Sequence, residues 1–412
     1  MIGPGLRRHP LVVQGYATAY AGLVRLGLRG RTGPRSFERV RIVAALGRQN
    51  GIATGAVLQW RALRSLGFDV DLVDATPAMR NPLFRAAHSP GTAYILHCGG
   101  PQTVCLLSAV LPHAAQAWRI AYWAWELPDP PRDWHGFDSF VSEVWTPSRF
   151  AQASLSRLTS RPIQVAPHAV PAQPPRLRER TAPFTVLAFA DSRSSLARKN
   201  PVGAIDAFMQ AFGNSPDARL IVKLNGPADE TETLEQRAAA APNVTLLRGF
   251  LSAEELAALY RTADVLLSLH RAEGFGLPML EAMAHGVPVV ATGWSGNLEF
   301  MDGRNGVLVP YSLVPVRDPA AIYGNSVWAE PEVAAAAAAL HRLASDHEHY
   351  RQMAEAAYAT VRSATPRLPL TGPLPAPVHE RPASLARPDL RPGLAAIRSR
   401  GGGIGSDVHL TE

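Results

Sequence analysis

The sequence predicts an α/β protein in which two doubly wound, Rossmann-like domains face a central cleft. Along most of its 412 residues, apolar segments of strand length alternate with helical stretches, a pattern that indicates parallel sheets. Glycine-rich turns follow several of these segments, as in doubly wound folds. The proline- and arginine-rich segment 171–183 divides the series in two and is expected to be an interdomain linker.

The first domain is expected over residues 39–170. A buried strand at 40–45 leads into a glycine-rich turn at 47–55 and a helix at 56–66. Further short apolar segments predict strands at 70–73, 93–98, 119–125, 143–146 and 162–166. Strands that alternate with helices in this way favour one parallel sheet.

The second domain is expected over residues 184–345, followed by a terminal helix over 346–364. Its predicted strands lie at 185–190, 219–224, 244–247, 265–269, 287–292 and 307–310. Helices are predicted at 333–344 and, within the terminal segment, at 349–363. Residues 328–331 are expected to open a helix, because proline suits the first helical turn. Residues 365–412 are rich in proline, arginine and glycine without periodicity, which predicts a disordered tail.

The amino-terminal arm, residues 1–38, contains an apolar segment at 11–28 with arginines on both sides. Gln14, Gly15 and Thr18 interrupt this segment, so it lacks the continuous apolar region of a signal peptide. No apolar run in the chain reaches the length of a membrane span. We expect a helix that packs on the protein, with peripheral membrane contact as the alternative.

The amino-acid composition indicates which binding partners and which cellular compartment to expect. The net charge is +7, and the 39 arginines are scattered and form no basic stripe, so no nucleic-acid partner is expected. Cys98 and Cys105 are too few for a disulfide framework and lack metal-ligand spacing. These observations favour a cytoplasmic protein, with peripheral association at the inner membrane face left open.

Two carboxylates eight positions apart mark the strongest candidate site. Glu273 follows an apolar segment at 263–269, and Glu281 lies a little over one turn into the helix that comes next. Backbone N–H groups at such a helix start favour an anionic or hydroxyl-rich ligand, and the intervening glycines let it approach. Carboxylates accept hydrogen bonds from sugar hydroxyls, while the loop can hold a phosphate. The alternative is an ordinary strand–loop–helix unit with a capping carboxylate.

This arrangement resembles the Glu-x7-Glu donor site of retaining glycosyltransferases of family 4, which have the GT-B fold. The resemblance implies that Glu273 is catalytic and holds sugar hydroxyls near the anomeric carbon, while Glu281 holds the ribose. It also implies that the donor diphosphate lies on the loop formed by Gly274, Phe275, Gly276 and Leu277.

A basic loop at 191–201 strengthens the resemblance, because it is similar to the Arg-Lys-Asn-Pro loop of the same family. Lys199 matches the family lysine, and either Arg193 or Arg198 could be its partner on the diphosphate. Fixed cations stabilise a departing diphosphate electrostatically. The alternative is a solvated basic loop. However, the chain contains only two lysines, and one of them, Lys199, lies in this loop. The other, Lys223, is expected to reach the cleft or to form an interdomain salt bridge.

Two first-domain segments, 121–128 and 143–150, resemble a subset of these enzymes. Trp123 is expected in the core, whereas Trp125 and Glu126 are expected to line the cleft. Many family members carry a histidine where Glu126 stands, so Glu126 is a second catalytic candidate.

The acceptor is expected to enter over Gly51 and the Trp125–Glu126 corner. His97 is a candidate substitute for the missing family histidine, although a lone histidine beside a glycine turn is usually structural. His168 matches a family hinge motif and is expected to order the linker.

The resemblance covers residues 40–345 and implies a nucleotide-sugar-dependent transferase. We find no Asp-x-Asp metal motif of the GT-A kind, so we expect no metal and no cofactor besides the nucleotide-sugar substrate. The expected acceptor is a saccharide or glycolipid, in polysaccharide or glycoconjugate biosynthesis. Two alternatives stay open: a GT-B sugar-nucleotide epimerase, and a non-catalytic sugar- or nucleotide-binding protein.

Overall fold

A computed structural model describes residues 10–28, 32–48, 50–173, 183–226, 231–319, 322–364 and 368–369. Apart from residues 368–369, the predicted tail lies outside the described residues, as do parts of the linker and the arm. The described strands form two six-stranded parallel sheets and one two-stranded sheet. Both large sheets lie within one compact unit, Met1–Ala376.

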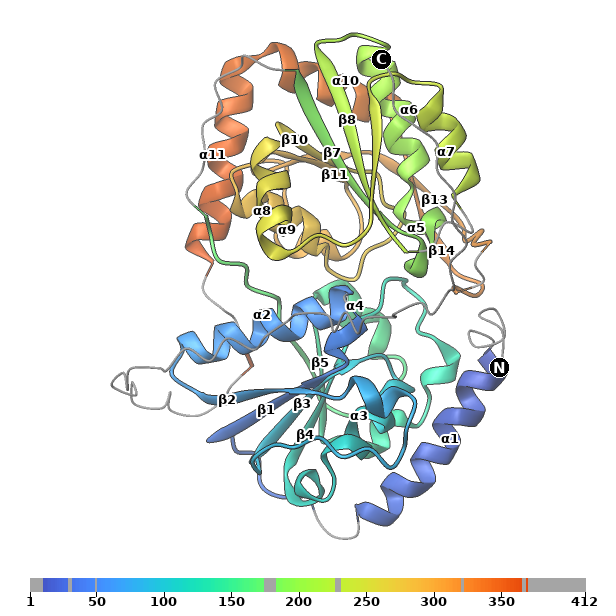
Figure 1. The fold of residues 1–412 in the computed structure, drawn as a ribbon, viewed down its shortest axis with the longest axis vertical. Helices are drawn as coiled ribbons and strands as arrows, with labels where there is room; N and C mark the ends of the chain where they lie inside the picture. Colours follow the sequence, from blue (N-terminus) through green and yellow to red (C-terminus); the bar gives the residue numbers. More distant parts are fainter. Residues whose placement is uncertain are drawn as a thin grey trace, which may run out of the picture. The chain divides into compact units, whose positions relative to one another are not determined.

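The first sheet has the order β2-β1-β3-β4-β5-β6 (Figure 1). Its strands are β1 (Arg39–Ala44), β2 (Asp69–Asp74), β3 (Ala93–Cys98), β4 (Trp118–Trp123), β5 (Glu143–Thr146) and β6 (Ile163–Val165). Its helices are α2 (Gly51–Ser65), α3 (Gln102–Val110) and α4 (Arg149–Leu155). Val40 and Ile42 share a core with α2, whereas Val43 shares the opposite core with α3. The alternation of side chains along β1 therefore places one helix on each face of the sheet.

Helix α2 begins earlier than the predicted residue 56. Asn50 is its N-cap, and its side chain accepts a hydrogen bond of 3.0 Å from the amide of Ala53. An asparagine cap satisfies an amide that a helix start would otherwise leave unpaired. Gly51 and Gly55 therefore lie in the first turns of α2, whereas Gly47 lies in the short 3-10 turn that precedes it.

The arm contributes helix α1 (Pro10–Gly27), which packs on the first domain. Tyr20 and Val24 are fully buried in the core that contains α3, and the Tyr20 hydroxyl donates a hydrogen bond to the carbonyl of Ala78. The described part of α1 therefore packs on the protein, as expected. Across the described ranges, no helix combines the length and the hydropathy needed to cross a bilayer.

The second sheet has the order β12-β11-β10-β7-β8-β9. Its strands are β7 (Phe184–Asp191), β8 (Ala218–Asn225), β9 (Val244–Arg248), β10 (Val265–Ser268), β11 (Val289–Thr292) and β12 (Val307–Val309). Its helices are α5 (Leu196–Lys199), α6 (Pro201–Phe212), α7 (Glu232–Ala239), α8 (Ala253–Thr262), α9 (Leu277–Ala284), α10 (Val333–Ser345) and α11 (His347–Ser363). Helices α6 and α10 cover one face, and α9 and α11 cover the other (Figure 1).

An antiparallel hairpin, β13 (Tyr311–Pro315) and β14 (Val327–Pro331), was not predicted. The expectation that residues 328–331 open a helix is wrong, because they pair with β13 and α10 begins only at Val333. Trp328 is 2% exposed and lies 5.7 Å from the guanidinium of Arg271. Strand pairing and burial of this ring override the helix-start signal of the proline.

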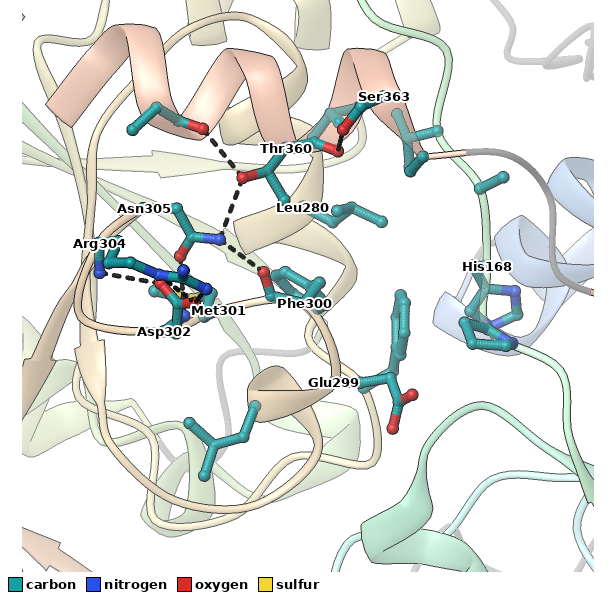
Figure 2. A pocket seen from close by; sticks show the side chains of 18 residues that line it. His168, Leu280, Glu299, Phe300, Met301, Asp302, Arg304, Asn305, Thr360 and Ser363 are labelled. Atoms are coloured by element: carbon teal, nitrogen blue, oxygen red, sulfur yellow. Dashed lines mark hydrogen bonds and ion pairs between the residues drawn. The ribbon is translucent and has the colours of Figure 1, made fainter. Parts of the chain in front are cut away.

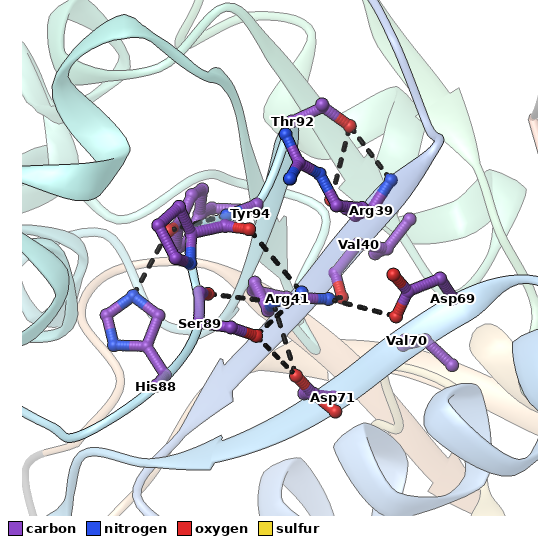
Figure 3. A network of polar contacts seen from close by, with 12 residues as sticks. Arg39, Val40, Arg41, Asp69, Val70, Asp71, His88, Ser89, Thr92 and Tyr94 are labelled. Carbon is purple, nitrogen blue, oxygen red and sulfur yellow. Dashed lines mark hydrogen bonds and ion pairs between the residues drawn. The ribbon is translucent and has the colours of Figure 1, made fainter.

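One Asp-x-Asp spacing does occur in the chain, at Asp69 and Asp71 on β2. Buried Arg41 lies 3.5 Å from an oxygen of Asp69 and 3.4 Å from one of Asp71, and it also donates to the hydroxyl of Ser89 (Figure 3). No group of three or more metal-ligating side chains occurs in the described residues. The pair of aspartates therefore neutralises a buried arginine and lies in a structural network.

Candidate active site

The two predicted donor loops follow neighbouring strands. Strands β7 and β10 pair with each other, although they are separated in sequence by β8 and β9. The basic loop follows β7, and the loop of Glu273 follows β10. The order of the strands reverses between β7 and β10, and ligands of doubly wound folds bind at such a switch point.

Glu273 lies at the centre of a cluster of charged side chains, which it forms with Lys199 and Arg198. It is 8% exposed. Lys199 forms an ion pair with its Oε1, and Nη1 of Arg198 lies 3.4 Å from the same oxygen. Burial alone would raise the pKa of Glu273, but the charges of Lys199 and Arg198 outweigh it and lower the pKa to about 2. Glu273 is therefore ionised throughout the physiological pH range.

The two candidate arginines have different environments. Arg198 is 3% exposed, and its Nη1 donates a 2.7 Å hydrogen bond to the carbonyl of Ala272. Arg193 keeps 29% of its side chain exposed and forms a bidentate pair with Asp191, at 2.7 and 3.0 Å. Its Nη1 also donates to the carbonyl of Arg48, at 3.1 Å, in the turn before α2. The geometry favours Arg193 as the arginine that can meet a ligand, and Arg198 as the one that holds Glu273.

Lys223 does not join the cluster. It is 2% exposed and donates to the side chain of Asn225, at 2.5 Å, and to the carbonyl of Gly249. Burial lowers the pKa of this ammonium group. These partners belong to the second domain, so they provide no interdomain salt bridge.

The donor loop is shaped by close backbone contacts. The carbonyl of Gly274 accepts a 2.6 Å hydrogen bond from the hydroxyl of Ser148 in the first domain. A Cβ at Gly274 would lie 3.0 Å from the carbonyl oxygen of Trp125, so the loop and the first domain meet with no room for a side chain. Gly276 caps α9 with a φ of 99°, which favours glycine. The amides of Gly276 and Leu277 therefore stand at the start of α9, where a helix leaves N–H groups without intrahelical partners.

Glu281 lies on α9, further from the basic pair. Its carboxylate accepts a 2.7 Å hydrogen bond from the hydroxyl of Tyr260, on α8. Burial raises the pKa of Glu281, and the hydrogen bond from Tyr260 offsets only part of that effect. The two glutamates of the motif therefore occupy environments of opposite electrostatic character.

The first-domain candidates separate into two groups. Strand β4 ends at Trp123, so Trp125 and Glu126 lie on the loop that follows it. Trp123 is in the core, as expected. Glu126 joins the cluster, because its Oε1 lies 4.0 Å from Nη2 of Arg198 and its side chain is 25% exposed. Trp125 was expected to line the cleft, but it is 9% exposed and its ring packs against Trp134 and Tyr323.

His97 is buried, at 2% exposure. Its Nε2 is 2.6 Å from the side-chain oxygen of Gln59, and its ring stacks on Tyr122. Burial lowers the pKa of His97 well below its usual value, so it is neutral. The candidate role of His97 as a substitute for the family histidine is not favoured, because its ring is enclosed between Gln59 of α2 and Tyr122 of β4. Gly51, in contrast, is exposed at the start of α2.

A family model described as glycosyl transferases group 1 matches residues 187–327. The match contains both loops of the cluster. Residues 187–327 are therefore similar to the glycosyl transferases of group 1.

Two curated relatives match parts of the same chain. The D-inositol 3-phosphate glycosyltransferase of Mycobacteroides abscessus is 35% identical over 123 residues, which are 28% of this chain and 27% of the relative. The GtfA subunit of the UDP-N-acetylglucosamine–peptide N-acetylglucosaminyltransferase of Streptococcus gordonii is 31% identical over 118 residues, 28% of this chain and 22% of the relative. The chain thus spans about a quarter of the length of these relatives.

The solved structure of Anabaena HepE with UDP and glucose aligns with a TM-score of 0.57 at 16% identity. The alignment covers 80% of this chain and 95% of that chain. The alignment extends beyond residues 187–327 and shows the fold of most of this chain. The predicted GT-B architecture is confirmed.

Three further residues pack around this cluster and were not among the predicted site residues. The hydroxyl of Ser295 accepts a 2.9 Å hydrogen bond from the amide of Glu273. His270 lies between Ser268 and Asn297, at 3.0 and 3.2 Å. Tyr323 packs on Arg198, with 5.9 Å between the guanidinium and the ring centre. Ser295 lies in the turn that follows the strand after the Glu273–Glu281 helix, and this position is a sequence signal for it; no comparable signal pointed to Tyr323.

A cavity of about 540 Å³ lies beside the donor loop, between the hinge and α11. Figure 2 shows His168 on one side and Asn305 and Thr360 on the other. The ring of His168 meets that of Phe275 edge to face, with centres 5.2 Å apart. The hinge histidine therefore contacts a donor-loop side chain directly.

Proposed function

We propose that this protein is a nucleotide-sugar-dependent glycosyltransferase that transfers a sugar, with retention of configuration, to a saccharide or glycolipid acceptor. The observation that carries the proposal is the cluster at the strand switch of the second domain, where Lys199 and Arg198 hold Glu273 beside an N–H-rich helix start. Cations and backbone amides suit a diphosphate, and an ionised carboxylate suits a sugar.

The diphosphate of the donor would lie among Lys199, Arg193 and the amides at the start of α9. Lys199 and Arg193 keep 18% and 29% of their side chains exposed, so both cations can meet an incoming phosphate. As the bond to the sugar breaks, negative charge grows on the phosphate, and fixed cations stabilise it most strongly at that point. This arrangement requires no metal ion.

Glu273 would hold sugar hydroxyls near the anomeric carbon and stabilise positive charge developing on the sugar ring. With a pKa of about 2 it cannot supply a proton at neutral pH. Glu126, on the opposite side of Arg198, would face the acceptor, and the departing phosphate itself can take the acceptor proton. Glu281, paired with Tyr260, would bind the ribose of the nucleotide.

The acceptor would enter over Gly51 and Glu126.

We propose that α1 keeps the protein near lipid-linked acceptors on the cytoplasmic face of a membrane. Leu23 and Leu26 on its outward side are 41% and 60% exposed. The first 37 residues contain six arginines and no acidic residue. Basic and apolar side chains together favour anionic lipid surfaces.

The test is a melting-shift and turnover screen of the purified protein with UDP-glucose, UDP-N-acetylglucosamine, GDP-mannose and ADP-glucose. A ligand that binds only the folded state raises the melting temperature. We expect one nucleotide sugar to stabilise wild type, and Glu273→Gln to bind it while losing most of its turnover.

The products separate the alternatives. Retention is checked by the anomeric configuration of the transferred sugar. An isomerised sugar released without an acceptor would identify an epimerase instead. Binding without any turnover would identify a binding protein, and the absence of any melting shift would overturn the proposed donor site.

A further inference from the structure

The start of helix α4, in the first domain, is bonded directly to the donor loop of the second. Ser148 is the N-cap of α4, and its hydroxyl oxygen accepts a 3.2 Å hydrogen bond from the amide of Ala151. The same hydroxyl donates a 2.6 Å hydrogen bond to the carbonyl of Gly274. Ser148 is 1% exposed, so solvent has little access to either bond. One hydroxyl therefore serves both a helix cap and the donor loop.

The two residues after the cap hold α4 in place against the second domain. The amide of Arg149 donates a 2.9 Å hydrogen bond to Glu299, and its guanidinium lies 3.5 Å from the same carboxylate. The ring of Phe150 meets that of Trp294 edge to face, with centres 5.1 Å apart. The bond to the donor loop is therefore one part of a larger junction, which fixes where the N-cap stands.

The hydrogen bond from Ser148 sets the orientation of the peptide between Gly274 and Phe275. This peptide is trans, so its N–H, on Phe275, points away from its carbonyl. Among the described residues, the amide of Phe275 donates to no protein acceptor, which leaves it available to a ligand. Because Gly274 lacks a Cβ, little else restrains rotation of the peptide. A rotated peptide would present a carbonyl oxygen, which repels phosphate, in place of the amide.

We infer that Ser148 is a positioning residue of the donor site, which holds the Gly274–Phe275 peptide so that the amide of Phe275 faces the donor diphosphate. This inference rests on the proposed function and adds to it a contribution from the first domain. Amides that are already oriented bind an anion more strongly, because binding then requires no reorganisation. Loss of the Ser148 hydroxyl should therefore weaken the hold on the diphosphate.

The experiment removes this hydroxyl in two ways. Ser148→Ala also removes the cap of α4, whereas glycine is a tolerated N-cap, so Ser148→Gly should melt at a higher temperature than Ser148→Ala. UDP, GDP and ADP are titrated by calorimetry, and inorganic pyrophosphate, which resembles only the diphosphate, competes with whichever of them binds. Both variants should bind that nucleoside diphosphate and pyrophosphate roughly tenfold more weakly than wild type.

Ser252→Ala is the matched control. Ser252 is the N-cap of α8 and accepts a 3.2 Å hydrogen bond from the amide of Glu255. The substitution removes a cap of the same kind without touching the bond to Gly274. It should lower the melting temperature and leave both affinities unchanged.

Four results would overturn the inference. These are wild-type affinity in Ser148→Gly, an equal loss in Ser252→Ala, a loss for the nucleoside diphosphate without one for pyrophosphate, and affinities that follow the melting temperature across the two Ser148 variants. A wild-type protein that binds none of the three nucleoside diphosphates would instead overturn the proposed donor site, so the two failures are distinguishable.

Discussion

Glu273 and Glu281 have the same side chain and lie eight positions apart, yet the fold gives them opposite acid strengths. Two cations lower the pKa of Glu273 to about 2, whereas burial beside a neutral phenol raises that of Glu281. Differences of this kind allow one site to assign different tasks to two carboxylates. At the residue scale, charge neighbours decide function more than residue type does.

Lys199→Ala should weaken donor binding, because it removes a cation from the proposed diphosphate site. A lost hydrogen bond to a charged group costs about 1.5–3 kcal/mol, which corresponds to roughly 10- to 100-fold in affinity. Isothermal calorimetry with the stabilising nucleotide sugar measures this change. Arg304→Ala is the control, since its side chain is 91% exposed and paired with Asp302. Equal affinities of wild type and Lys199→Ala would remove the phosphate assignment.

Glu281→Gln should raise the melting temperature while weakening nucleotide binding. Because the folded state raises the pKa of Glu281, the unfolded chain ionises first as pH increases, and the carboxylate reduces stability above the folded pKa. Glutamine keeps an acceptor for Tyr260 without the buried charge. We expect a gain of roughly 2–4 °C at pH 7, by differential scanning calorimetry.

The gain in melting temperature of Glu281→Gln over wild type should shrink as the pH falls below the pKa of a glutamate in the unfolded chain. At such pH values Glu281 is protonated in both the folded and the unfolded state. A variant that is less stable than wild type at pH 7 would contradict the assigned environment of Glu281.

Among the individual elements, helix α1 and the β13–β14 hairpin lie outside the two parallel sheets. Both bury aromatic residues in the core of the first domain, through Tyr20 in one case and Tyr323 and Trp328 in the other. The hairpin belongs to the second half of the chain, so this core receives side chains from both halves. These elements therefore connect the halves by packing, whatever their roles in catalysis.

Deleting residues 1–27 should lower the melting temperature, because it uncovers apolar surface that Tyr20 and Val24 now bury. The double substitution Leu23→Ser and Leu26→Ser changes only exposed positions and should leave stability unchanged. If α1 also meets lipid, this variant should sediment less with vesicles containing phosphatidylglycerol. Unchanged sedimentation would leave packing as the role of α1.

At the scale of the whole molecule, the chain after α11 returns to the first domain. Leu368 packs against the core that contains Val40 and Ile42, and Arg35 joins the carbonyl of Pro369, at 2.8 Å, to the carboxylate of Glu143, at 3.3 Å. The segment predicted to be a disordered tail, residues 365–412, therefore includes two residues that contact the fold.

Truncation after residue 370 should leave activity and melting temperature unchanged. Truncation after residue 364 should lower the melting temperature, because it removes Leu368 and the partner of Arg35. Thermal melts and turnover of the two truncations, beside the full chain, make the comparison. Equal melts would show that the contacts of residues 368–369 contribute nothing measurable.

Sequence patterns alone predicted the two parallel sheets, which the structure has, and the two loops whose Lys199 and Glu273 form an ion pair. Apolar runs and glycine turns report local backbone preference, and the motifs of Glu273 and Lys199 follow strands whose ends must meet in a doubly wound sheet. Only the tertiary structure decided which arginine is buried, that Trp125 and His97 are enclosed, and that Tyr323 enters the site. Burial and charge neighbours depend on contacts between segments far apart in the chain, and no local pattern encodes those distances.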